Sequence, residues 1–205
     1  LSFFMNWHIG IPSTPIVSVG DKVLKGQKIG EASGFLSSNI FSSVSGTVKS
    51  IEYKIGINGQ KGLAIVIEND RLYETVNNYS TPRDWQNLSK DEILEIIKEN
   101  GIVGMGGAGF PTHVKLTVKD EVDIKYIICN GAECEPYITC DYRLMLERPE
   151  DAVTGMKIVQ KIFLCLCLSG VFAFAQETVE GVRRQIKSVE AETAREKSMH
   201  DAEKK

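Results

Sequence analysis

The sequence lacks several features that would place it in a class at once. It has no basic excess, since 24 Lys and Arg oppose 27 Asp and Glu for a net charge of −3, and nucleic-acid binders normally carry a basic face. Its five cysteines form no CxxC pair and no zinc-like spacing, which indicates reduced cytosolic thiols. The N-terminus has no charged region of the kind that opens a secretory signal peptide. These absences argue against a nucleic-acid partner, a zinc module and an N-terminal export signal.

What the chain does have is an ordinary globular composition. It contains 205 residues, of which 42% are hydrophobic and 25% charged. That length suffices for one large or two small domains. The first residue is not methionine, which is consistent with a fragment of a longer protein.

The first 70 residues are predicted to be all-β. Apolar residues alternate with others, and turns that contain glycine separate the alternating segments. Short strands at such intervals are typical of a small sandwich or barrel. The expected strands lie at residues 15–19, 23–26, 27–30, 44–51 and 63–67.

This β region resembles the barrel-sandwich hybrid of biotinyl and lipoyl carrier domains. The resemblance rests on VGDKVLKGQKI at residues 19–29 and VSGTV at residues 44–48. Those carriers present a lysine at the hairpin tip between the two halves. The corresponding stretch, residues 33–43, contains no lysine, so a docking or structural module is favoured over a swinging arm.

The following residues are expected to form a linker and then helices. Residues 73–88 are polar and contain Pro82, which indicates a linker. Ser89 and Glu92 have the spacing of a capping box, which predicts a helix that ends at Asn100. Pro149 fits the first turn of a later helix. The other expected elements are a short helix or loop at 115–122, a buried strand at 124–129, and helices at 139–147 and 151–162.

The stretch from residue 101 to 136 is the most informative. Its first nine residues hold five glycines, too many for a helix interior, where each costs about 1 kcal/mol relative to alanine. Such glycines let the backbone approach a ligand closely, and Lys115 follows, where its ammonium can meet a phosphate. Asn130, Glu133 and Glu135 come directly after the predicted strand, where open α/β sheets collect ligand-binding groups. Together these groups predict a nucleotide-type cofactor site.

Two motifs in this stretch resemble one family. The chain resembles the C subunit of the Rnf electron transport complex in GMGGAGFPTHVK at residues 104–115 and CNGAECEPY at residues 129–137. The same pair resembles, more distantly, the flavin-carrying NADH-oxidising subunit of respiratory complex I. The β region and HIGIP at residues 8–12 add to the resemblance, which runs to about residue 158. Two motifs in this order are a more specific signal than a glycine loop alone.

The resemblance implies an α+β fold in several parts. An N-terminal all-β barrel-sandwich hybrid at residues 1–72 is followed by a linker at 73–88. A partial Rossmann-like α/β domain that binds FMN and NADH is expected at 89–158, and a helical tail at 159–205. The residues that the motifs place at the cofactors are Gly104, Gly106, Gly107, Gly109, Phe110, Lys115, Asn130, Glu133 and Glu135.

The resemblance also implies an activity. The family member oxidises NADH and passes electrons to iron–sulfur centres, as a peripheral subunit on the cytoplasmic side of the membrane with other subunits of the ion-translocating complex as partners. Its 4Fe–4S clusters need cysteines in CxxCxxC-type spacing. Cys129, Cys134 and Cys140 lack that spacing, so the chain is expected to be a fragment with part of the site. The alternative function is a non-catalytic docking or interaction module.

Each candidate site residue also has a structural interpretation. The glycine loop can be an ordinary tight connection, and Lys115 a solvated lysine. Glu133 and Glu135 can cap the following helix. His113 is better explained by packing than by proton transfer, and Cys134 by filling a small space.

The C-terminal region departs from the family pattern. Residues 156–175 have a basic start, an apolar core and a small-x-small ending at Ala175, as a secretory signal peptide does. The apolar run is shorter than the roughly 20 residues that span a membrane. Residues 176–205 alternate in charge like a solvated helix. We interpret the chain as a chimera joined near Met156; the alternative is a buried helix at 151–175.

Overall fold

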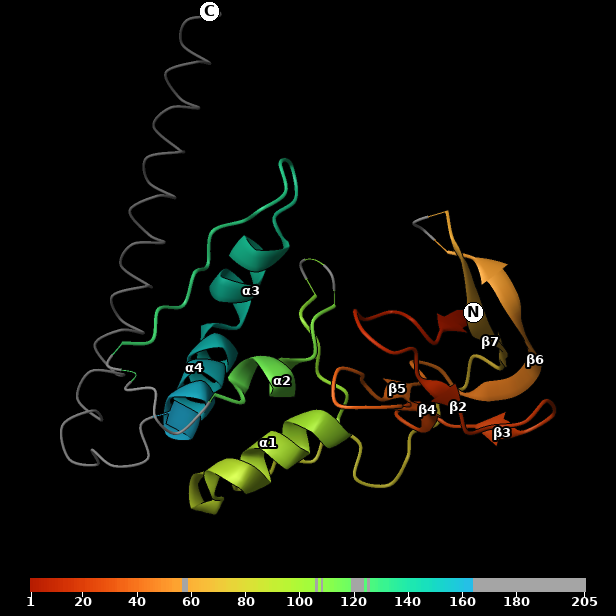
Figure 1. Ribbon diagram of the computed structural model, residues 1–205, viewed down its shortest axis with the longest axis horizontal. Helices are drawn as coiled ribbons and strands as arrows, with labels where there is room; N and C mark the ends of the chain where they lie inside the picture. Colours follow the sequence, from red (N-terminus) through yellow and green to blue (C-terminus); the bar gives the residue numbers. More distant parts are fainter. Residues whose placement is uncertain (57–58, 106, 108, 119–123, 125, 164–205) are drawn as a thin grey trace, which may run out of the picture. The chain divides into compact units, whose positions relative to one another are not determined.

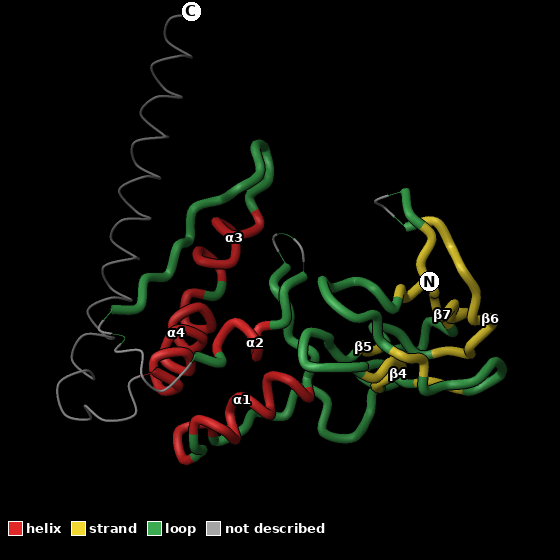
Figure 2. Tube along the Cα trace, in the orientation of Figure 1, coloured by secondary structure: helices red, strands yellow, loops and turns green. Residues whose placement is uncertain are grey.

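A computed structural model describes residues 1–56, 59–105, 107, 109–118, 124 and 126–163. The chain forms two compact units, Leu1–Val122 and Asp123–Lys205. The described strands all lie before residue 70, and the described helices follow them along the chain (Figure 2). The predicted signal-peptide-like run after Phe163 and the charged tail lie outside the described residues.

The described strands form two antiparallel sheets in the first unit (Figure 1). One sheet has the strand order β1-β7-β6-β3 and the other the order β2-β4-β5. We refer to residues 1–72, which contain all of these strands, as the β module. The strands are β1 (Ser2–Phe4), β2 (Thr14–Pro15), β3 (Lys22–Val23), β4 (Lys28–Glu31), β5 (Ile40–Phe41), β6 (Gly46–Ile55) and β7 (Lys61–Asn69).

Both sheets contribute to one aliphatic core. Alternate residues of β6 and β7 turn inward, so that Val48, Ile65 and Ile67 are at most 1% exposed. Burying a side chain of this size contributes about 1.5–3 kcal/mol. The other buried members of the core are Met5, Val23, Ile29, Ile40 and Val44.

The alternating pattern predicted the long strands better than the short ones. The strands expected at 44–51 and 63–67 are confirmed and are longer than expected. The strand expected at 15–19 is reduced to Thr14–Pro15, and β1 and β5 had no predicted counterpart. Strands of two or three residues depend on their partners more than on their own sequence. The result is two sheets and no closed barrel among the described residues.

Two helices and a 3₁₀ turn complete the described part of the first unit. The turn, η1, spans Trp85–Asn87, and helix α1 spans Lys90–Glu99. The predicted capping box is confirmed, because the Ser89 hydroxyl accepts the Glu92 N–H and the Glu92 carboxylate accepts the Ser89 N–H. Helix α2 (Thr112–Leu116) packs against α1.

The second unit contains two described helices, α3 (Cys140–Glu147) and α4 (Pro149–Phe163), which pack together. The proline begins α4, as expected from its fixed φ and missing N–H. None of the helices that the structure describes is long and apolar enough to cross a lipid bilayer.

The buried strand predicted at residues 124–129 is wrong for the residues that the structure describes there. They form no strand, and the side chains of Tyr126 and Ile128 are 86% and 89% exposed. An apolar run becomes a strand only when another strand pairs with it, and none of the described residues does so. The described residues from 76 onward contain one isolated β-bridge and no strand.

Candidate cofactor site

The glycine loop is closed at its base by two backbone hydrogen bonds. The N–H of Gly104 donates to the carbonyl of Phe110 at 2.9 Å, and the N–H of Thr112 donates to that of Ile102 at 2.9 Å. Val103 and Pro111 form an antiparallel bridge between them. The loop therefore has a fixed neck, and helix α2 starts directly after it.

The glycines of this loop are of two kinds. A Cβ built on Gly107 would meet no described atom within 4 Å, and one built on Gly104 would come no closer than 3.9 Å to Phe110. Gly109 has a φ of +63°, and its Cβ would lie 2.6 Å from the carbonyl oxygen of Trp7. Gly107 thus borders open space, Gly104 has room for a Cβ at ordinary contact distance from Phe110, and Gly109 is needed for close packing. Gly106 lies outside the described residues.

The side chains that follow the glycines are accessible. Lys115 is exposed on α2, and no described residue forms an ion pair or hydrogen bond with its ammonium. Phe110 is 39% exposed. An exposed ammonium without a described partner, six residues after Gly109, suits a phosphate, so Lys115 fits the predicted anionic group.

The second predicted motif lies in the second unit, on the segment before α3. The side-chain oxygen of Asn130 accepts the N–H of Ala132 at 3.0 Å, which forms an Asx turn. This leaves the amide nitrogen of Asn130 as a donor. Glu135 is exposed, and its carboxylate has no partner among the described residues.

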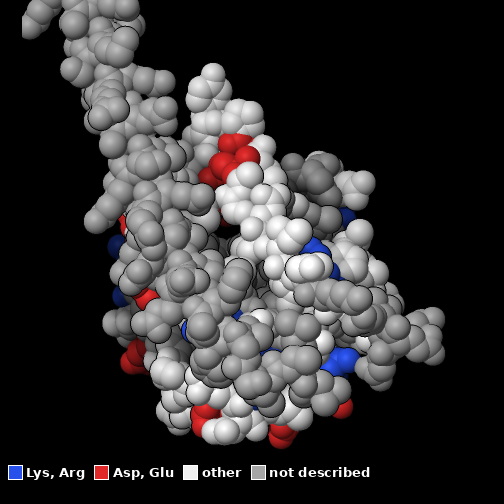
Figure 3. All heavy atoms as spheres, turned by 90° about the vertical axis from the view of Figure 1, so that its left-hand side faces the viewer, with Lys and Arg blue, Asp and Glu red and all other residues white. Residues whose placement is uncertain are grey.

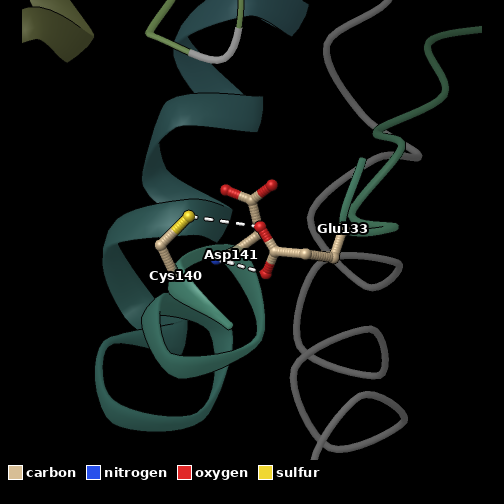
Figure 4. A group of neighbouring side chains, drawn as sticks. All are labelled: Glu133, Cys140 and Asp141. Carbon is tan, nitrogen blue, oxygen red and sulfur yellow. Dashed lines mark hydrogen bonds between the residues drawn. The ribbon is translucent and has the colours of Figure 1, made fainter. Parts of the chain in front are cut away.

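Glu133 is a helix cap. Its carboxylate reaches from the extended segment to the start of α3 (Figure 4), where it accepts the N–H of Asp141 at 2.9 Å and of Tyr142 at 3.3 Å. It also accepts the thiol of Cys140 at 3.1 Å. Thr139, the residue at the N-cap, makes no side-chain cap. The capping interpretation of Glu133 is therefore confirmed, and three of the roughly four lone-pair positions of the carboxylate are occupied.

These contacts shift two pKa values in opposite directions. Desolvation disfavours the charged form of Glu133, but the hydrogen bonds from Cys140, Tyr142 and Asp141 outweigh it and lower the pKa of this carboxyl. The hydrogen bond to Glu133, together with desolvation and the negative charges nearby, raises the pKa of the Cys140 thiol. The thiol therefore keeps its proton and acts as a donor.

The same three residues have the composition of a small metal site. Ligand atoms of Glu133, Cys140 and Asp141 lie within 4.8 Å of one another. A metal would require the Cys140 thiolate, whereas the geometry holds the thiol protonated against Glu133. The helix cap accounts for this cluster.

Charge is unevenly distributed over the described surface. On the face drawn in Figure 3, one compact group of acidic side chains stands out, and other acidic and basic side chains are scattered over the rest of that face. Acidic groups repel a phosphate, so the basic Lys115 and the glycine loop are better suited to hold one than the carboxylates of the second motif.

The predicted site residues thus fall into two sets. The glycine loop, Phe110 and Lys115 belong to the first unit, and Asn130, Glu133 and Glu135 to the second. Within each set the residues lie on one short segment of the chain. Their roles toward a cofactor stay predictions.

Several contacts around the site had no sequence signal. His113 is 5% exposed, as its packing interpretation required, and it donates from Nε2 to the Phe35 carbonyl at 3.2 Å. Asn39 donates to the carbonyl of Glu99 at 3.1 Å. These partners are 60 or more residues apart in the sequence, so no local pattern could indicate them. The Cys140 donor did have a signal, its place at the first position of a helix that follows Glu133.

The chain matches two protein families. Residues 97–203 match the family described as the Nuo51 FMN-binding domain, and residues 1–72 match the RnfC barrel sandwich hybrid domain. The first match covers more than half of the chain, which places it in the class of proteins built on the Nuo51-type FMN-binding domain. With its N-terminal module, the chain belongs to the RnfC family, the C subunits of Rnf electron transport complexes. The predicted family and the predicted barrel-sandwich hybrid are confirmed.

Curated relatives, all of them C subunits, agree with this family. The chain is 49% identical over 155 residues to the C subunit of the "Proton-translocating ferredoxin:NAD(+) oxidoreductase complex" of Clostridium ljungdahlii. This match covers 76% of this chain and 34% of the relative. It is 42% identical over 160 residues to the C subunit of the Na(+)-translocating complex of Acetobacterium woodii. This match covers 77% of this chain and 35% of the relative. It is 41% identical over 156 residues to the C subunit of the "Ion-translocating oxidoreductase complex" of Rhodobacter capsulatus. This match covers 75% of this chain and 30% of the relative.

The chain therefore spans about a third of the length of these relatives. The family match runs to residue 203, past the predicted junction near Met156, whereas the pairwise similarity covers 155 to 160 residues. The chimera stays a prediction.

Proposed function

We propose that this chain carries the first part of the FMN site of an NADH-oxidising Rnf-type subunit, within a Rossmann-like α/β domain. The observation that carries the proposal is the glycine loop. Gly107 borders open space, two hydrogen bonds fix the base of the loop, and the Lys115 ammonium, which has no described partner, follows the loop. The match to an FMN-binding domain over residues 97–203 supports the same ligand.

Each residue has a distinct part in this proposal. The backbone N–H groups of the loop and the Lys115 ammonium bind the phosphate. Phe110 contacts the nucleotide through its exposed ring. The Asn130 amide and the Glu135 carboxylate hydrogen-bond to polar groups of the flavin or of NADH, and Glu133 adds one further acceptor position while it caps α3. When bound, FMN supplies acceptance of a hydride from NADH and release of single electrons toward iron–sulfur centres.

We further propose that the chain works as a peripheral subunit on the cytoplasmic side of a membrane complex, with the other subunits as partners. The relatives are named as subunits of ion-translocating complexes, and their names specify protons in one case and Na⁺ in another. The coupling ion of this chain does not follow from them.

A second candidate function is a non-catalytic docking module. The observation that favours it is the exposed apolar surface of the second unit, where Tyr126, Ile128 and Tyr137 are largely exposed. Exposed apolar side chains mark an interaction site where they form a contiguous patch.

The two functions are separated by adding FMN to the purified chain and following flavin fluorescence, then adding NADH and following bleaching of the flavin absorbance. The proposed site predicts saturable quenching with FMN in the micromolar range, and bleaching by NADH if both halves of the site are complete. Quenching without bleaching indicates a flavin site without a productive NADH site. No binding at tens of micromolar FMN would contradict the proposed site and favour the docking module.

A further inference from the structure

Both ends of the glycine loop pack against the backbone of the β module. Gly101 has a φ of +61°, and a Cβ there would lie 2.3 Å from the carbonyl oxygen of Asn39. Gly109 makes the equivalent close approach to the Trp7 carbonyl. Only glycine permits both the positive φ and the short distance, so the two ends of the loop are fixed against the backbone of the β module.

Side chains strengthen both attachments. The Asn39 side chain accepts the N–H of Ala32 at 2.9 Å and donates to the Glu99 carbonyl at 3.1 Å, which links the β4–β5 loop to the last turn of α1. Behind the glycine loop, His113 donates to the Phe35 carbonyl at 3.2 Å. The rings of Phe35 and His113 meet edge to face with centroids 6.1 Å apart.

These attachments are buried and specific. Asn39 and His113 are 6% and 5% exposed, and a buried donor that loses its partner is costly. The partner of the His113 Nε2 is a carbonyl, which can only accept, so this nitrogen carries the proton. By contrast, a Cβ on Gly107, between the two attached ends, would meet no described atom within 4 Å. The loop is thus held at Gly101 and Gly109 and borders open space at Gly107.

We propose that the β4–β5 loop, residues 32–39, positions the glycine loop for ligand binding, which makes Asn39 and His113 positioning residues of the cofactor site. The inference rests on the proposed FMN site and gives the β module a task within it. In this arrangement the module is neither a swinging carrier nor a separate docking domain. It fixes the two ends of the glycine loop, at Gly101 and Gly109, before the ligand arrives, which lowers the ordering cost of binding.

The test compares His113→Leu with His113→Gln in the 205-residue chain. Leucine removes the donor, whereas the glutamine amide can replace Nε2 as the donor to Phe35. Two quantities are measured: the dissociation constant for FMN, and hydrogen exchange of residues 101–112 and 61–69 without ligand. Asn39→Asp is a second variant, since it keeps the acceptor for Ala32 and loses the donor to Glu99.

The proposal predicts that His113→Leu weakens FMN binding about tenfold, as the loss of one buried hydrogen bond would. Exchange should rise at residues 101–112 and stay unchanged in β7, and His113→Gln should lie within about threefold of the wild type. Asn39→Asp should change both quantities in the same direction as His113→Leu.

Three results would overturn the proposal. In the first, His113→Leu keeps wild-type affinity and wild-type exchange at residues 101–112. In the second, exchange rises equally in β7, which would make His113 a general stabilising residue. In the third, the wild type binds no FMN and hydrogen exchange at residues 101–112 is the same in His113→Leu as in the wild type. The absence of FMN binding contradicts the proposed function, and the unchanged exchange contradicts the positioning role. Faster exchange confined to 101–112 would support the positioning role even without FMN binding.

Discussion

The backbone N–H of Asp141 donates to the carboxylate of Glu133, eight residues earlier, at 2.9 Å. This bond and its neighbours give α3 the N-terminal acceptor that Thr139 does not provide. A residue that the family motif places at the cofactor is thus also a helix cap. Both tasks are compatible, because a carboxylate offers about four lone-pair positions and the cap uses three.

Replacing Glu133 with alanine should loosen the first turn of α3. Because the acceptor is lost, the amides of Asp141 and Tyr142 should exchange about fivefold faster, in line with the usual effect of removing a cap. Glu135→Ala is the matched control, since the Glu135 carboxylate caps no described N–H. Hydrogen exchange followed by NMR measures the difference, and equal exchange in the two variants would show that Glu133 does not cap the helix in solution.

The same cap should depend on pH. In the folded state the hydrogen bonds to Glu133 lower the pKa of its carboxyl below the ordinary value. A carboxyl with a lowered pKa contributes stability that is present above its unfolded pKa and is lost as the pH falls through the folded pKa. The amide shifts of Asp141 and Tyr142 should therefore titrate below about pH 4.3, the usual pKa of a glutamate, in the wild type. Persistence of that titration in Glu133→Ala would show that Glu133 is not the group that titrates.

The thiol of Cys140 should react slowly with alkylating reagents. Its hydrogen bond to Glu133 raises its pKa, and the thiolate is the reactive form. At pH 8 we expect iodoacetamide to alkylate Cys140 roughly threefold or more slowly than the exposed Cys129 and Cys134. Mass spectrometry of timed samples gives the three rates in one experiment. Glu133→Ala should speed up Cys140 alone, and an equal rate for all three thiols in the wild type would contradict the hydrogen bond.

Replacing different glycines of the loop with alanine should change the stability of the fold by different amounts. Gly109→Ala forces a side chain into a positive φ and against the Trp7 carbonyl, so it should destabilise the fold by about 1–3 kcal/mol. Gly107→Ala enters open space and should change stability by less than about 0.5 kcal/mol. Urea unfolding of the two variants makes the comparison. Equal destabilisation would mean that Gly107 is also packed against the protein.

The sequence predicted features whose determinants are local. The capping box of α1 and the place of Pro149 in the first turn of α4 depend on residues within one helical turn, and both were predicted correctly. The apolar run at residues 124–129 was misread because a strand depends on a partner strand, which a periodic pattern does not reveal.

In the candidate site, too, the features with local sequence signals were predicted and the contacts between residues far apart in the sequence were not. The motifs identified the glycine loop and the three polar residues that follow it along the chain. The attachments of the loop to Trp7 and Asn39 were missed because these residues lie 62 to 102 positions from Gly101 and Gly109 in the sequence. That Glu133 caps α3 was foreseen only as one of two interpretations, since both use the same carboxylate.

The measurement that tests the central claim most directly compares FMN with riboflavin, which lacks the phosphate. If the glycine loop and Lys115 bind that phosphate, the wild-type chain should bind FMN at least about tenfold more tightly than riboflavin, the gain expected from a charge-assisted contact. Lys115→Met should remove most of that difference and leave riboflavin binding unchanged. Equal affinity for the two flavins in the wild type, or an FMN preference that survives in Lys115→Met, would contradict a phosphate site formed by this loop and Lys115.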